Sequence, residues 1–205
     1  MIDPFNVTDF GRTERELEEY LFFCIAVANK TARIIAPKIA MFLEAALPGE
    51  SPFDCVLRLE AEGRLLEELQ RAKTGKYTTL VPSYPDAARR LRGRLATVAL
   101  DELMTLKGVG EKTSRYFVLH SRRDHGRIAV IDTHILKYLR QLGHDVPKGL
   151  PKGDGYARLE RLVIAAAEAA GMSMPDFDLA VWSHYASKGV KPPLPVLRST
   201  AETAA

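Results

Sequence analysis

The chain has 205 residues, of which 46% are hydrophobic and 27% charged, the composition of an ordinary globular protein. No apolar run is long enough to cross a bilayer, and the polar, acidic start does not resemble a secretion signal. We therefore expect no membrane partner and a cytoplasmic location. The two cysteines, Cys24 and Cys55, lie in apolar stretches and form no Cys-x-x-Cys pair. This pattern predicts buried, reduced thiols and offers no support for a metal site or an iron–sulfur cluster.

The net charge of +3 hides an uneven distribution along the chain. Residues 1–85 contain 10 Lys and Arg against 13 Asp and Glu, residues 86–161 contain 16 against 9, and residues 162–205 contain 3 against 4. A basic middle between two slightly acidic ends favours a localised surface for a polyanion. Because basic stretches are often only solvated surface, charge alone does not identify nucleic acid as the partner.

Helical periodicity dominates from the first motif onward. Thr13-Glu14-Arg15-Glu16 is a capping box that leads into apolar residues spaced as one helical face. Further helices are predicted, in chain order, at 32–46, from 51 to near 63, at 65–69, from 83 through the arginines at 89–94, at 99–106, at 111–121, from 132 onward, at 156–170 and at 176–187. No segment alternates convincingly over the length of a strand. The predicted fold class is therefore all-α.

The segment Leu106-Lys107-Gly108-Val109-Gly110-Glu111-Lys112-Thr113 lies between two of these helices. Gly108 and Gly110 allow a tight reversal, since glycine adopts backbone angles that other residues avoid, and Val109 is expected to tuck under as an apolar pin. The bend turns the first N–H groups of the next helix toward a phosphate, and carbonyls of the loop could hold a monovalent cation. These features predict a helix-hairpin-helix motif at residues 99–121, which binds the DNA backbone. The alternative is a plain turn between helices.

Lys112 occupies the first helical turn, where the helix dipole disfavours a cation and favours the neutral, nucleophilic amine. A basic residue at this place also contacts phosphate in non-catalytic hairpins, so Lys112 alone fits both roles.

Asp132 follows the apolar run 128–131 and begins a helix, where aspartate is a good N-cap. Capping is compatible with catalysis because it fixes the position of the carboxylate. A carboxylate that faces a nucleophilic lysine stabilises positive charge on a sugar as its base departs. We predict that Lys112 and Asp132 form a catalytic pair.

Two strings, Gly108-Val109-Gly110-Glu111-Lys112 and Ile131-Asp132-Thr133-His134-Ile135, together resemble the signature of the endonuclease III superfamily of DNA repair glycosylases. The resemblance implies a six-helix barrel domain at residues 31–129 and a domain of N- and C-terminal helices at residues 1–30 and 130–205, which flank a DNA-binding cleft. It also implies that Lys112 displaces a damaged base and forms a Schiff base, and that β-elimination then nicks the strand. Asp132 would activate the lysine, and the base must leave the stack to be reached.

Two further segments are similar to cluster-free 8-oxoguanine DNA glycosylase/AP lyases, which lack the four C-terminal cysteines of endonuclease III. Around residues 22–31 the resemblance implies that Asn29 fills the gap left by the extruded base, although a helix C-cap is the alternative for Asn29. Around residues 177–185 it implies a base pocket, whereas core packing is the alternative for Trp182. The resulting candidates are Asn29, Lys30, Gly108, Val109, Gly110 and Thr113 for DNA binding, and Asp178, Trp182 and Lys188 for the pocket.

The resemblance thus predicts a monomeric base-excision enzyme that acts on 8-oxoguanine in double-stranded DNA and needs no cofactor beyond the hairpin cation. In a bacterium or archaeon it would be associated with the nucleoid. Two alternatives stay open at this point. One is a glycosylase for an oxidised pyrimidine or a mismatched thymine or uracil, and the other is a non-catalytic helix-hairpin-helix module.

Overall fold

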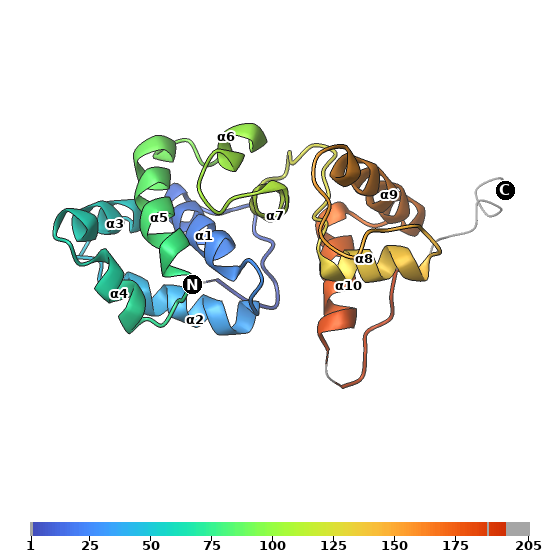
Figure 1. Ribbon diagram of the computed structural model, residues 1–205, viewed down its shortest axis with the longest axis horizontal. Helices are drawn as coiled ribbons and strands as arrows, with labels where there is room; N and C mark the ends of the chain where they lie inside the picture. The colour runs from blue at the N-terminus through green and yellow to red at the C-terminus, as the bar shows by residue number, and fades with distance from the viewer. Residues whose placement is uncertain (1, 188, 196–205) are drawn as a thin grey trace. The chain divides into compact units, whose positions relative to one another are not determined.

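The computed structural model describes residues 2–187 and 189–195. These residues form ten α-helices and no strand (Figure 1), which confirms the predicted all-α class. The chain divides into two compact units, Met1–Arg122 and Arg123–Ala205. Among the described helices, none combines the length and the apolar character that crossing a membrane requires.

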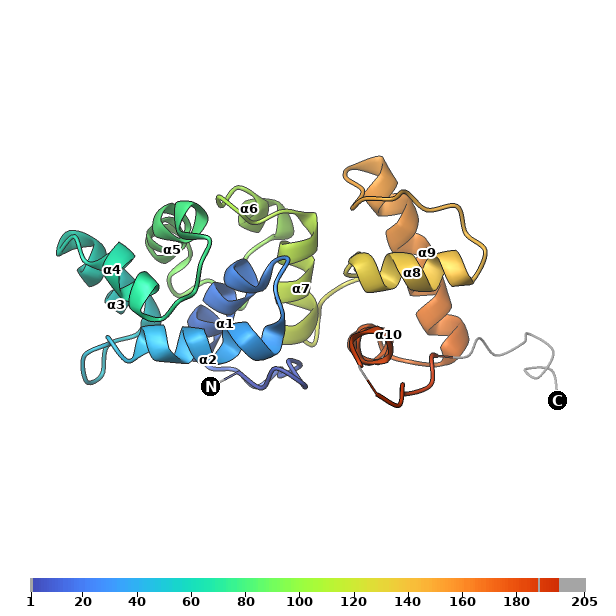
Figure 2. The same ribbon diagram turned by 60° about the horizontal axis from the view of Figure 1, so that its bottom comes forward.

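The first unit is built around its first helix. The helices of this unit are α1 (Glu14–Val27), α2 (Ala32–Leu43), α3 (Pro52–Ala61), α4 (Leu65–Arg71), α5 (Tyr77–Leu91), α6 (Leu100–Met104) and α7 (Glu111–Ser121). Residues 20–26 of α1 are all buried, as expected for a helix that is covered on every side. They pack against α2, α3, α5 and α7, and Figure 2 shows α1 between α2, α5 and α7.

The observed division differs from the predicted one, which grouped residues 1–30 with residues 130–205. Residues 1–30 belong to the first unit because α1 provides much of its core. Tyr20 illustrates this, since its ring stacks on Phe23 of α1 and on Phe117 of α7, and it also carries the Arg12 guanidinium at 4.0 Å. The remaining helix positions agree with the sequence pattern except at α5.

Helix α5 begins at Tyr77, six residues before the predicted start at Ser83, and includes Pro82 and Pro85. Proline inside a helix removes a backbone hydrogen bond, which is why the sequence pattern places the start later. Packing overrides this preference, because Leu80 and Tyr84 are fully buried on the inner face of the helix. Tyr84 stacks on Phe22 of α1 and donates from its hydroxyl to the Phe22 carbonyl at 2.8 Å.

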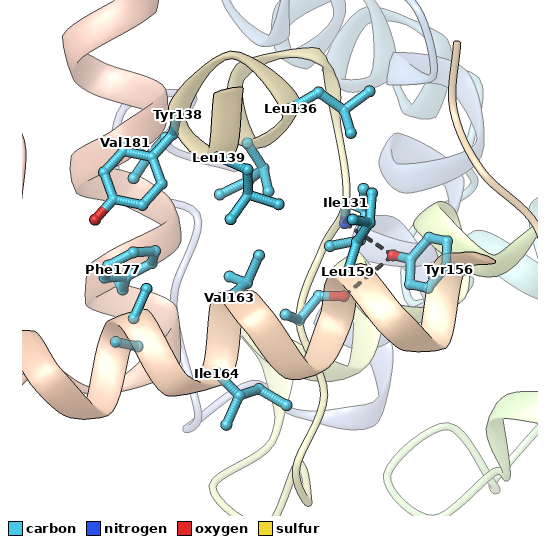
Figure 3. Packing of buried hydrophobic residues seen from close by; sticks show 14 residues of the cluster. Ile131, Leu136, Tyr138, Leu139, Tyr156, Leu159, Val163, Ile164, Phe177 and Val181 are labelled. Carbon is cyan, nitrogen blue, oxygen red and sulfur yellow. Dashed lines mark hydrogen bonds between the residues drawn. The ribbon is translucent and has the colours of Figure 1, made fainter. Parts of the chain in front are cut away.

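The second unit contains three helices around one apolar cluster (Figure 3). They are α8 (Thr133–Gln141), α9 (Asp154–Ala170) and α10 (Met174–Ala186). Leu159 and Val163 of α9 face Leu139 of α8, and Phe177 of α10 meets Tyr138 edge to face at 5.4 Å. The extended segment 128–131 contributes Ala129 and Ile131 to the same cluster and leads directly to Asp132. The core therefore positions the residue that the sequence singles out.

Candidate functional site

The hairpin between α6 and α7 depends on Gly108 for two physical reasons. Gly108 has a φ of +82°, a conformation that side chains disfavour, and a Cβ at this position would overlap Cγ2 of Thr79 on α5. The Ser83 hydroxyl, also on α5, donates a hydrogen bond to the Lys107 carbonyl. Helix α5 therefore supports the hairpin through the close approach of Thr79 to Gly108 and the hydrogen bond from Ser83.

Val109 and Gly110 differ in how well they match expectation. Val109 is only 5% exposed, which confirms the predicted apolar pin. The expectation that Gly110 needs an unusual backbone angle is wrong, because its φ of −110° and ψ of −171° are ordinary extended values. A Cβ at Gly110 would meet nothing within 4 Å. What glycine provides at this position is open space in front of the helix rather than conformational freedom.

The start of α7 is arranged as a donor site for an anion. The first helical hydrogen bond runs from the Ser114 N–H to the Gly110 carbonyl at 3.0 Å, so the N–H groups of Lys112 and Thr113 have no partner within the helix. Such groups bind phosphate well. Thr113 is 7% exposed, so only its backbone N–H is suitably placed for the predicted DNA contact, since the side chain is covered.

Lys112 is partly buried in the first turn of α7. Its ammonium group makes no hydrogen bond and no ion pair with any residue that the structure describes. An amine that serves as a nucleophile must not be engaged by a carboxylate, and Lys112 meets this condition. The surroundings of Lys112 within the first unit therefore suit a reactive amine.

The arginines at 89–94 differ from the lysines of the described residues in their ion pairs. The four arginines of the α5 region are each paired with a carboxylate: Arg89 with Glu60, Arg90 with Asp86, Arg92 with Asp54 and Arg94 with Glu102. By contrast, no lysine of the described ranges forms an ion pair. A DNA phosphate would have to compete with carboxylates for the arginines but not for the lysines. The lysines near the hairpin are thus the better candidates for backbone contacts.

Asn29 and Lys30 follow α1 and are both exposed. Asn29 has a φ of 60° directly after the C-cap residue Ala28, which is the left-handed position that commonly ends a helix. The backbone of Asn29 therefore fits the alternative, in which this residue ends the helix. Its side chain is exposed, so the predicted contact with DNA stays a prediction. The Lys30 ammonium donates to the Thr74 carbonyl at 2.6 Å.

Asp132 is the N-cap of α8. Its Oδ1 atom accepts hydrogen bonds from the N–H groups of His134 at 2.8 Å and Ile135 at 2.9 Å. The predicted cap is thus confirmed, and it fixes the orientation of the carboxylate. Lys112 belongs to the first unit and Asp132 to the second, so their action as a pair stays a prediction.

The sequence reasoning missed the residues that hold the segment before Asp132. The Ala129 N–H donates to Oε1 of Glu160 at 2.9 Å. The Ile131 N–H donates to the Tyr156 hydroxyl at 2.8 Å (Figure 3). An extended segment outside a sheet needs such partners for its buried N–H groups. In the sequence, the only indication of these partners is that Tyr156 and Glu160 stand among the apolar positions of α9.

The predicted base-pocket residues lie at the C-terminal end of the chain. Asp178 is 8% exposed on α10, and Trp182, one turn later, is partly buried. Phe177 and Val181 of the same helix belong to the apolar cluster, whereas Trp182 does not. Lys188 lies outside the described residues. The pocket therefore stays a prediction.

The described fold is similar to that of solved 8-oxoguanine DNA glycosylases. The structure is similar to that of the Methanocaldococcus jannaschii 8-oxoguanine glycosylase/lyase, solved in complex with a 15mer DNA containing 8-oxoguanine, with a TM-score of 0.67 and 24% identity over 88% of this chain and 86% of that chain. It is also similar to the 8-oxoguanine DNA glycosylase of Thermotoga maritima, with a TM-score of 0.61 and 23% identity over 88% and 84%. At these identities the likeness shows the fold.

Sequence relatives carry the same description. The 8-oxoguanine DNA glycosylase/AP lyases of Thermotoga sp. (strain RQ2) and Thermotoga neapolitana are each 31% identical over 121 residues, or 58% of this chain. The aligned part spans about half the length of these relatives, 51%. No family profile matches the chain.

Proposed function

We propose that the chain is a DNA glycosylase with AP lyase activity that removes 8-oxoguanine from double-stranded DNA in base-excision repair. The observation that carries the proposal is Lys112, an uncommitted amine in the first helical turn after a phosphate-binding hairpin. The 8-oxoguanine enzymes among its relatives and structural neighbours support the choice of lesion.

The proposed reaction begins with the hairpin. The N–H groups at the start of α7 bind a phosphate next to the lesion, and the damaged nucleotide leaves the stack so that its glycosidic bond becomes accessible. Neutral Lys112 then attacks C1′ with its lone pair, the C1′–N bond breaks, and the base departs with the bonding electrons and takes up a proton. Asp132 stabilises the positive charge that develops on the sugar.

The second half of the reaction cuts the strand. The Lys112 nitrogen releases one proton to solvent, the C1′–O4′ bond then breaks as the nitrogen forms a protonated imine with C1′, and O4′ takes up a proton from solvent. The imine makes the C2′ proton acidic, and its removal expels the 3′ phosphate by β-elimination. Hydrolysis of the imine finally releases Lys112 for another turnover.

In this proposal the enzyme is a monomer in the cytoplasm, and its partner is damaged duplex DNA. A monovalent cation at the hairpin remains part of the proposal but no step requires it. The carbonyls of Leu106 and Lys107 each accept one hydrogen bond, from Val109 and Ser83, which leaves each with one lone pair for a cation.

Borohydride trapping tests the proposal across duplexes that contain 8-oxoguanine, thymine glycol, uracil or an abasic site. The wild-type chain should form a covalent adduct on 8-oxoguanine and abasic duplexes, and Lys112→Gln should abolish it. Lys107→Gln is the matched control, because Lys107 is exposed on the same hairpin and should weaken DNA binding while leaving the adduct. Binding without any adduct would instead favour a non-catalytic module, and an adduct on thymine glycol or uracil alone would change the target base.

A further inference from the structure

Two loops of the first unit contain every positive φ that occurs outside glycine in the described residues. Asn29 follows α1 with a φ of 60°, and Lys73 and Lys76 precede α5 with φ values of 53°. Asparagine tolerates this region because its short side chain bonds locally, whereas lysine has no such compensation. Backbone strain of this kind persists only where surrounding contacts hold it, and it gathers at functional sites.

Two lysines tie these loops to each other in opposite directions. Lys30 donates to the Thr74 carbonyl at 2.6 Å. Lys76 donates to the carbonyls of Ile25 at 3.0 Å and Ala28 at 3.4 Å. We call residues 28–31 and 73–76 the clamped loops, because each supplies an ammonium group that binds backbone of the other segment or of the helix end beside it.

The contacts of Lys76 complete the end of α1. Helix α1 has no basic residue in its own last turn, and its final carbonyls carry the negative end of the helix dipole. A cation from the other loop therefore stabilises this end and holds the chain where it turns into Asn29.

Gly75 lies beside the Lys30 contact. Gly75 has a φ of +67°, and a Cβ on it would overlap the Lys30 Nζ atom. The glycine thus leaves the space that the ammonium group occupies next to the Thr74 carbonyl.

The environment of Lys76 connects the clamped loops with the candidate nucleophile. Burial lowers the pKa of Lys76 from its ordinary value, and the positive charges of Lys30 and Lys112 lower this pKa further. Lys30 and Lys76 donate to backbone carbonyls, and none of the three lysines forms an ion pair with a described carboxylate.

We propose that Lys76 and Lys30 are positioning residues that hold the Asn29 turn in the shape with which it enters the gap left by the extruded base. This inference rests on the proposed function, from which the role of Asn29 is taken. The lysines act through the turn and not on the reacting atoms.

The test compares Lys76→Met with Lys73→Met under single-turnover conditions. Lys73 has the same φ, lies in the same loop and is exposed without a side-chain hydrogen bond to any described residue, so it is a matched control. Lys76→Met should slow removal of 8-oxoguanine by roughly tenfold or more, since a small misplacement of a positioning group costs up to about a hundredfold. Cleavage of a pre-formed abasic site should change much less, because Lys112 is intact and no base has to be extruded.

Rescue and hydrogen exchange separate positioning from a general loss of structure. Lys76→Arg should restore most of the rate, since a guanidinium can donate to both carbonyls. Amide exchange of residues 28–31 without DNA should be faster in Lys76→Met than in Lys73→Met. The positioning role would be overturned if Lys76→Met exchanged its amides and removed the base at wild-type rates. It would also be overturned if the variant lost the same fraction of its rate on 8-oxoguanine and on abasic duplexes.

The exchange measurement also distinguishes the two proposals. If the wild-type chain formed no adduct on any duplex, the proposed function would fail and the role of the clamped loops in base removal would fail with it. Slower exchange at residues 28–31 in the wild type than in Lys76→Met would still establish the contact itself. If the wild type formed adducts and Lys76→Met matched it in every measurement, only the positioning role would be lost.

Discussion

The backbone N–H of Ile131 donates a 2.8 Å hydrogen bond to the Tyr156 hydroxyl, which itself donates to the Ala129 carbonyl at 3.1 Å. Through this hydroxyl, helix α9 provides hydrogen-bond partners for backbone groups of an extended segment that has no sheet partner (Figure 3). Ile131 immediately precedes Asp132, so a tyrosine 25 residues away determines where the candidate carboxylate lies.

Replacement of Tyr156 by phenylalanine tests this relationship. Loss of the hydroxyl leaves the buried Ile131 N–H without its acceptor, which should lower the free energy of unfolding by about 1–3 kcal/mol. Denaturant titration measures the loss, and base removal should slow because Asp132 shifts. Tyr138→Phe is the control, since the Tyr138 hydroxyl makes only a 3.4 Å bond to the Pro195 carbonyl. Equal destabilisation by both substitutions would contradict the special role of Tyr156.

Two substitutions at Asp132 separate its capping role from its catalytic role. Asparagine is as good an N-cap as aspartate, so Asp132→Asn should keep thermal stability and DNA affinity while greatly slowing base removal. Asp132→Ala should lose the cap as well, at a cost of about 1 kcal/mol in the free energy of unfolding. Calorimetry together with single-turnover kinetics provides both measurements. An undiminished rate in Asp132→Asn would refute the catalytic assignment.

The two hairpin glycines should respond differently to alanine. Gly108→Ala combines a disfavoured φ of +82° with an overlap on Thr79, so the hairpin must move, and we expect a loss of about 1–3 kcal/mol in the free energy of unfolding. Gly110→Ala should leave stability within about 0.5 kcal/mol, in the range of ordinary surface substitutions, because nothing lies near its Cβ.

Binding of undamaged duplex by the Gly110→Ala chain completes this comparison. The added methyl group stands in the open space before α7 and should weaken affinity, with little change in the melting temperature. Unchanged affinity would show that the phosphate does not approach over Gly110.

The buried thiols predict a loss of stability at alkaline pH. Burial, and then the charge of Glu50, raise the pKa of Cys55 to about 11 from an ordinary value of 9.0, and burial also raises the pKa of Cys24. The unfolded chain therefore releases these protons first. Stability from each thiol is fully present below pH 9 and is lost as pH rises, by up to about 1.4 kcal/mol per pH unit.

Denaturant titrations at pH 8 and pH 10 measure this effect. The free energy of unfolding should fall over that range, and Cys55→Ala should reduce the fall because one of the two thiols no longer titrates. An identical pH dependence in the variant would contradict the raised pKa of Cys55. Thiol-specific labelling at pH 8 should likewise be slow in the folded chain and rapid in denaturant.

The helices, the hairpin and the cap at Asp132 were predictable because their causes are local. A capping side chain reaches the N–H groups two and three residues ahead, and the apolar pin Val109 lies between the glycines that form its turn. The residues that make such interactions are neighbours in the sequence, so a short string such as Gly108-Val109-Gly110 identifies them.

The start of α5 and the place of α1 were not predictable in this way. Proline within residues 82–85 argued for a later start, but burial of Leu80 and Tyr84 against α1 outweighs one or two missing helical hydrogen bonds. The grouping of residues 1–30 depended on which neighbours α1 meets, and those neighbours come from four other helices. Packing partners are a property of the whole chain rather than of any window of it.

The sequence by itself determined which chemical groups the protein has available: a lysine just after a Gly-Val-Gly turn and a carboxylate at a helix start. Only the tertiary structure decided how these groups are held. Thr79 lies 29 residues before Gly108, and Lys76 lies 48 residues after the Ala28 carbonyl that it binds. Contacts over such separations leave no periodic trace, because their geometry arises only when the helices pack.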